Sequence, residues 1–100
     1  MSNLKSTRKS KDIISVLKKK GFVIEPEKDH HRYYCLLDRN GKKTTIYTYF
    51  SHGKKEYNTF LLKQIKKELK FNNNSDFEDF LNCPMSYDMY IEMLNKNQDL

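Results

Sequence analysis

The sequence is poor in the features that mark secreted and membrane-spanning proteins. It has no tryptophan, only two cysteines, and no apolar run near the roughly 20 residues that a membrane-spanning helix needs. Cys35 and Cys83 are too few for a disulfide framework and lack metal-site spacing. We expect reduced thiols in a cytoplasm, although a disulfide between them stays open. Residues 1–11 are polar and basic, so no secretory signal is visible and no membrane contact is expected.

The motifs of several enzyme classes are also missing. With three glycines in all, the chain has no glycine-rich phosphate loop, and it has no nucleophile elbow. Its acidic residues are scattered, without a two-metal cluster. Asp29 with His30 and His31 is a conceivable metal site, but adjacent histidines on a strand point to opposite sides. We therefore expect neither a metal nor a cofactor.

Charge is distributed unevenly along the 100 residues. Residues 1–71 hold 18 of the 19 basic side chains and 7 of the 13 acidic ones, which gives +11 there and −5 in residues 72–100. Such an asymmetry favours a polyanionic partner, such as RNA, for the first part. The alternative is that the lysines serve solubility alone.

Periodicity and turn residues predict an α+β fold with the order α-β-β-β-α and two further short helices. Three strands are expected to form one antiparallel sheet, covered on one face by helices. The predicted helices are 10–20, one that Asn58 caps, 75–82 and one that Ser86 caps; the predicted strands are 22–25, 31–37 and 44–50. Residues 1–9 are expected to be a loose basic arm and 51–57 a loop.

Several local signals sharpen this prediction. Gly21 is expected to end the first helix in a left-handed conformation, and Asn40-Gly41 to form a hairpin turn. Ser10 is expected to cap the first helix, and Ser75 with Glu78 to form a capping box. In the strand 31–37, alternate residues face opposite sides, and both sides carry apolar groups, so the buried side stays open.

Two parts of the chain are distinguished by charge. Residues 1–71 are expected to form an RNA-binding domain, and residues 72–100 an acidic helical extension packed on the same domain. Because both extension helices are amphipathic, added core is the favoured role. Shielding of the basic face and binding of a protein partner are the alternatives.

The segment Lys28-Asp29-His30-His31-Arg32 is the strongest candidate for chemistry. RNA cleavage without a metal needs a base for the 2′-hydroxyl, an acid for the leaving 5′-oxygen and cations near the phosphate. Histidine can fill either proton-transfer role near neutral pH, and Lys or Arg can offset the growing charge. The alternative is a pair of surface histidines at the start of a strand.

Other candidates surround this segment. His52 follows the third strand, beside the start of the second, so it can approach His31 as a second proton carrier or be an ordinary loop histidine. Candidate RNA-binding residues are Lys28, His30, Arg32, Lys54, Lys55, Lys63, Lys66 and Lys67. With Lys70, the last three form a helix face that is otherwise simply solvated. Tyr33, Tyr34, Tyr47 and Tyr49 can stack on bases, although core positions are the commoner use of such residues.

The chain resembles the HicA-type toxins, mRNA interferases of type II toxin–antitoxin systems. The likeness lies in residues 9–23, in Asp29-His30-His31-Arg32, in residues 52–56 and in residues 62–69. It implies a double-stranded-RNA-binding-like fold, cleavage of mRNA, and a HicB-type antitoxin as partner. It also implies that His31 is catalytic and that His52 matches a histidine frequent before the second helix.

The resemblance has two departures. Lys28 and Asp29 replace the family's usual Gly-Ser before the histidine pair, and the acidic extension exceeds the minimal family length. A HicA-like endoribonuclease is the favoured function. A non-catalytic RNA-binding module of the same fold, and a protein-interaction domain acting through its acidic extension, are the alternatives. Neither the RNA sequence nor the oligomeric state follows from the sequence.

Overall fold

The computed structural model describes residues 7–26, 31–51, 53–82 and 84–100. In chain order the elements are β1 (Thr7–Lys9), α1 (Ser10–Lys19), β2 (Phe22–Ile24), β3 (His31–Leu37), β4 (Lys43–Ser51), β5 (Glu56–Asn58), α2 (Thr59–Glu68), α3 (Asn74–Asn82) and α4 (Tyr87–Lys96). The predicted α+β class and the order α-β-β-β-α, here α1-β2-β3-β4-α2, are confirmed.

The main sheet is antiparallel with the strand order β2-β3-β4. The turn predicted at Asn40-Gly41 joins β3 to β4: Gly41 has a φ of +80°, and the Asp38 carboxylate accepts the Asn40 and Lys42 N–H groups at 2.8 and 3.0 Å. This turn sets a register in which His31 lies opposite Ser51, at the far end of the hairpin.

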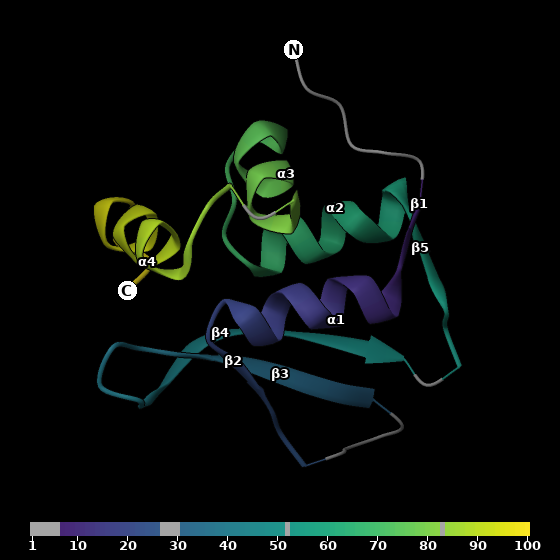
Figure 1. The fold of residues 1–100 in the computed structure, drawn as a ribbon, viewed down its shortest axis with the longest axis horizontal. Coiled ribbons are helices and arrows are strands. Elements are labelled where there is room, and N and C mark those ends of the chain that lie inside the picture. The colour runs from purple at the N-terminus through teal and green to yellow at the C-terminus, as the bar shows by residue number, and fades with distance from the viewer. Residues whose placement is uncertain (1–6, 27–30, 52, 83) are drawn as a thin grey trace.

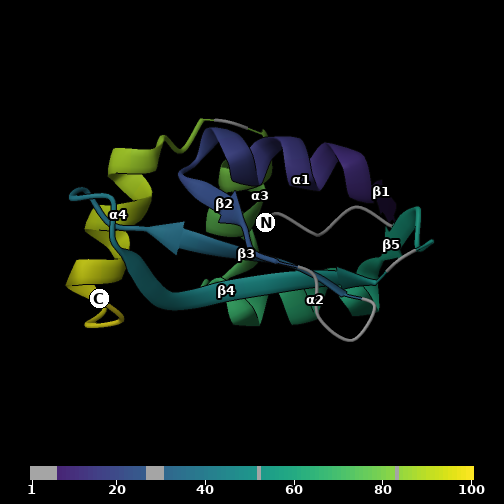
Figure 2. The same ribbon diagram turned by 90° about the horizontal axis from the view of Figure 1, so that it is seen from below.

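The helices cover one face of this sheet and leave the other open. In Figure 1 the helices lie above the three strands, and Figure 2 looks from below onto a face with no described helix in front of it. Tyr34 and Leu36 of β3 are almost fully buried on the helix side. The ambiguity of β3 is thereby resolved: even-numbered residues face the core, and His31 and Tyr33 face outward.

A second, two-stranded sheet pairs β1 with β5 and places Arg8 opposite Tyr57. The prediction of a loose arm over 1–9 is therefore wrong for Thr7–Lys9, and the predicted loop 51–57 ends in a strand. Three-residue strands nearly 50 positions apart carry no local signal, because their pairing depends on the folded chain. The Ser10 N–H extends the contact by donating to the Lys55 carbonyl at 2.8 Å.

The helix caps divide into predicted and unpredicted ones. Asn58 and Ser86 cap α2 and α4 as expected, each accepting a backbone N–H three residues on. The prediction that Ser10 caps α1 is wrong. Ser10 lies inside α1, and the N-terminal end of this helix is held by backbone hydrogen bonding next to the second sheet. The Ser75 capping box is also wrong, because α3 begins at Asn74 and the Asn73 side chain accepts the Asp76 N–H.

The C-terminal helices share one core with the rest of the chain. Phe80 and Tyr90 lie in an aromatic cluster with Phe22 and Phe71, with ring centroids 4.9–6.4 Å apart. The Tyr90 hydroxyl donates to the Leu69 carbonyl at 2.8 Å. The core thus continues from the sheet into α3 and α4. In the described parts of the chain no helix has the length and apolarity to cross a membrane.

Candidate functional site

His31 is the first residue of β3 and lies on the open face of the sheet. Its ring stands perpendicular to that of Tyr49, with centroids 5.1 Å apart, and its strand partner is Ser51. The side chain is half-buried. His31 therefore sits at the end of the sheet, packed on one side and within reach of solvent.

A hollow of about 360 Å³ opens at this point, where the end of β4 meets α2. It is lined by side chains from β3, β4, β5 and α2 and from the segment between β4 and β5. These are His31, Tyr49, Ser51, Lys54, Tyr57, Leu61, Gln64, Ile65 and Glu68. We call this the His31 hollow. It combines an imidazole, an ammonium group, a phenol and a carboxyl in one concave space.

Two proton-bearing groups of the hollow are shifted by their surroundings. Burial raises the pKa of Glu68, and the Thr48 hydroxyl, which donates to its carboxylate at 2.6 Å, opposes that shift. Burial also raises the pKa of Tyr57, whose hydroxyl accepts the Ser51 N–H at 3.3 Å. Both groups therefore favour their neutral, proton-bearing forms more than exposed ones do.

Arg32 reaches this region from the opposite side of the sheet. It lies opposite Phe50 and so faces the helices, whereas His31 faces outward. Its positive charge acts on Tyr57, where it lowers the pKa against the effect of burial. Its Nε is buried and has no hydrogen-bond partner among the described residues. Arg32 thus adds positive charge near Tyr57, on the helix side of the sheet.

The predicted lysines separate into two groups. Lys54 lines the His31 hollow, and Lys55 lines a neighbouring one with Lys9 of β1 and Lys11 of α1. The lysines of α2 lie elsewhere: Lys63, Lys66 and Lys67 line a hollow with Lys70 and Asp99. At 100° per residue Lys63 and Lys66 are turned away from Gln64 and Glu68 around α2, whereas Lys67 lies about 60° from Gln64. The structure does not bring these three lysines to His31.

Some predictions fall outside the described residues. Lys28, His30 and His52 are among them, so their assignments stay predictions. Cys83 is also outside, while Cys35 is a buried free thiol whose pKa burial raises. Of the four tyrosines proposed for base stacking, Tyr34 is in the core, and Tyr33, Tyr47 and Tyr49 are on the open face.

Sequence reasoning missed the two further titratable side chains of the hollow, Tyr57 and Glu68. A weak signal for Glu68 was present, because it is the one acidic residue of its helix and follows Ile65 by three positions, near the apolar stripe. Tyr57 carried no such signal, since the strand that orients it was not predicted.

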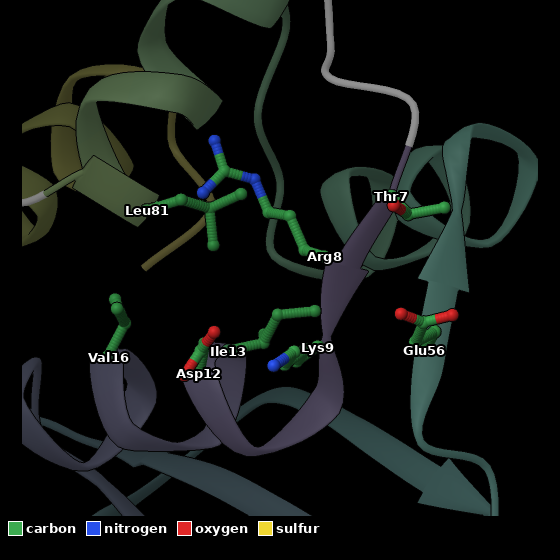
Figure 3. Close-up of a pocket in the computed structure, with 8 residues that line it drawn as sticks. All are labelled: Thr7, Arg8, Lys9, Asp12, Ile13, Val16, Glu56 and Leu81. Atoms are coloured by element: carbon green, nitrogen blue, oxygen red, sulfur yellow. The ribbon is translucent and has the colours of Figure 1, made fainter.

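A further hollow lies between β1, α1 and α3 (Figure 3). Arg8 extends from β1 toward Leu81, and its Nη1 donates to the Asn82 side chain at 3.2 Å. Asp12 and Glu56 line the same space. These carboxylates oppose an anionic ligand, so Arg8 is better explained as a bridge between β1 and α3.

Comparison with known proteins gives one family. The sequence matches the family model described as HicA toxin of bacterial toxin–antitoxin over residues 10–71, which runs from α1 to just beyond α2. No curated protein and no solved structure matches the chain. The matched segment contains the three-stranded sheet and every described residue of the His31 hollow. Because it covers more than half of the chain, the protein belongs to the HicA toxin family of bacterial toxin–antitoxin systems.

Proposed function

We propose that this toxin is a metal-independent endoribonuclease that cleaves mRNA, with His31 as a proton-transferring catalytic residue. The observation that carries the proposal is the His31 hollow, where a solvent-accessible imidazole shares a concave space with Lys54, Tyr57 and Glu68. The basic charge of residues 1–71 supports a polyanionic substrate.

The reaction follows from the chemistry of RNA. A base takes the proton of a 2′-hydroxyl, the 2′-oxygen attacks the adjacent phosphorus, and the bond to the 5′-oxygen breaks as that oxygen receives a proton. The products are a 2′,3′-cyclic phosphate and a 5′-hydroxyl. His31 is suited to either proton transfer, while Lys54 and Arg32 supply positive charge for the phosphate, with Lys28 as a further cation.

The second proton carrier has two candidates. His52 is the one that the sequence and the family resemblance favour. Glu68 is the one that the hollow adds, because burial favours its protonated form and so suits it to donate to the leaving oxygen. The pH–rate profiles of His52→Ala and Glu68→Gln distinguish the two candidates. The variant whose profile loses its acidic or basic limb identifies the second proton carrier.

A HicB-type antitoxin is the proposed protein partner. Membership of a toxin–antitoxin family implies an antitoxin, and the open position of His31 supports neutralisation by covering the hollow. Co-expression with the product of a neighbouring reading frame tests this. Rescue of growth and a stable complex are expected.

The ribonuclease proposal is tested with purified, antitoxin-free protein and a 5′-labelled RNA. Removing a general acid or base typically costs roughly 10²–10⁴-fold in rate, so we expect His31→Ala to lose cleavage to about that extent. Lys96→Ala, which changes an exposed lysine of α4 outside the candidate RNA-binding residues, is the matched control and should cleave RNA much as the wild type does.

The outcomes separate the candidate functions. Undiminished cleavage by His31→Ala would remove the proposed mechanism. Salt-dependent RNA binding by the wild type with no new RNA ends would instead favour a non-catalytic RNA-binding module. Circular dichroism of each variant checks that the fold is retained.

A further inference from the structure

Four aromatic rings form an unbroken strip on the open face of the main sheet. Tyr33 and Tyr49 are cross-strand partners, and their neighbours on the same face are His31 and Tyr47. Ring centroids are 5.1 Å apart from His31 to Tyr49, 5.4 Å from Tyr49 to Tyr33 and 5.9 Å from Tyr33 to Tyr47. We call these four residues the aromatic strip. It starts at the His31 hollow and runs along β3 and β4.

The strip is not part of the core. Tyr47 is 50% exposed and Tyr49 39%, whereas Tyr34, Tyr57 and Tyr90 are at most 6% exposed. No described helix lies over this face (Figure 2). Contiguous exposed apolar groups of this kind mark binding surfaces more often than isolated ones do.

The charges around the strip suit a polyanion. Glu25 lies beside Tyr33 and Tyr47, and its carboxylate forms an ion pair with Lys43 at 2.8 Å. Lys54 lies at the His31 end, and residues 1–71 carry a net charge of +11. A ligand with both negative charge and exposed ring faces therefore fits this surface.

We propose that the aromatic strip is a stacking platform for unpaired bases, so that the substrate is single-stranded RNA at and beside the bond that His31 attacks. Tyrosine rings bind the faces of unpaired bases with little regard to sequence. Bases inside a duplex do not present those faces. This inference rests on the proposed ribonuclease function and adds the substrate class to it.

An antitoxin is the other macromolecule to consider for this face. RNA is favoured because the strip is continuous with the His31 hollow, through the contact between Tyr49 and His31. A base stacked on Tyr49 would place its own phosphate beside the imidazole. An antitoxin needs no such alignment of rings with a reacting group.

The test measures binding of the full chain to a 2′-O-methyl RNA, which lacks the attacking hydroxyl and stays intact. A single-stranded oligonucleotide with 2-aminopurine at successive positions is compared with the same sequence in a duplex. Tyr47→Thr combined with Tyr49→Thr removes two rings and keeps strand-forming residues. Tyr47→Phe combined with Tyr49→Phe keeps the rings, and Phe60→Ala removes a 70% exposed ring on α2.

We expect the wild type to prefer the single strand and to quench 2-aminopurine. The threonine variant should lose at least roughly tenfold in affinity for the single strand. The phenylalanine variant and Phe60→Ala should stay close to the wild type, and thermal melts should show all variants folded.

Equal affinity of the threonine and Phe60→Ala variants for the single strand would overturn the proposal, as would equal wild-type affinity for single strand and duplex. Lost binding of a HicB-type antitoxin with RNA affinity unchanged would assign the strip to a protein instead. These results leave the ribonuclease proposal standing, because that depends on cleavage by the wild type and its loss in His31→Ala.

Discussion

In the His31 hollow, the protonation of a side chain depends on its burial as much as on its neighbours. Glu68 illustrates this, because the same carboxyl is half-buried under the sheet and accepts the Thr48 hydroxyl. Burial is the larger effect and raises its pKa above the ordinary value of 4.5. The folded protein therefore binds this proton more tightly than the unfolded chain does.

This shift gives a pH-dependent prediction for Glu68→Gln. The stabilisation due to the bound proton is complete below the unfolded pKa and is lost as pH rises through the folded one. At pH 7 the buried carboxylate is destabilising, so the neutral amide should raise the free energy of unfolding. Urea titrations should show this gain shrink as pH falls toward about 4.5 and vanish below that pH. The exposed Glu92→Gln is the control, and a gain independent of pH would contradict the prediction.

At the scale of elements, the turn between α1 and β2 packs closely against Tyr87 of α4. Gly21 has a φ of +87°, and a Cβ there would lie 2.6 Å from the Tyr87 ring. The ring cannot easily yield, because the Tyr87 hydroxyl donates to the Leu37 carbonyl at 2.8 Å. Gly21 therefore ends the helix, as its sequence position indicates, and also makes room for the C-terminal helix.

Two alanine substitutions separate these roles. Gly41→Ala, at a φ of +80° with nothing within 4 Å, should cost only the left-handed backbone penalty of about 1–2 kcal/mol. Gly21→Ala should cost more, because the clash with Tyr87 is added. In a Tyr87→Ala background the difference between the two should close. Equal free energies of unfolding for both variants in the wild-type background would show that the contact has no effect.

At the scale of the whole molecule, the acidic C-terminal part is tied to the basic part by packing rather than by charge. Phe77, Phe80, Tyr90 and Leu94 are fully buried. The ion pair between Arg39 and Asp88 is exposed and 3.7 Å long, a type that contributes little. We propose that residues 72–100 complete the core of one folding unit.

Removal of residues 72–100 tests this proposal. Truncation would expose Phe22, Leu69 and Phe71, so we expect the shortened chain to lose its cooperative thermal transition and to bind hydrophobic dyes. Asp88→Asn with Glu92→Gln changes only exposed charge and should leave the melting temperature nearly unchanged. Cooperative melting of the shortened chain would mean that residues 1–71 fold alone.

The Asp88→Asn and Glu92→Gln variant also tests the alternative in which the extension binds a protein partner. Deletion cannot test that alternative cleanly, because it removes core residues along with the charges. Substituting the exposed carboxylates alone keeps the core. A partner held by those charges would then be lost from an intact fold.

Local chemistry allowed much of this structure to be predicted from the sequence. Apolar spacing, the Asn58 and Ser86 caps and the Asn40-Gly41 turn act within a few residues, so they indicated the elements of the main sheet and its helices. The sequence also pointed to His31 and to the family. The strand over 31–37 was predicted, but not its buried side, since both sides carry apolar groups.

Only the tertiary structure decided which side chains share a site with His31. The pairing of β1 with β5 orients Tyr57, and the packing of α2 against the sheet brings Glu68 to the hollow and turns Lys63, Lys66 and Lys67 away. The aromatic strip likewise depends on the β3–β4 register. These contacts join residues far apart in the chain, and long-range pairing is set by the packing of the whole core, which no short stretch of sequence encodes.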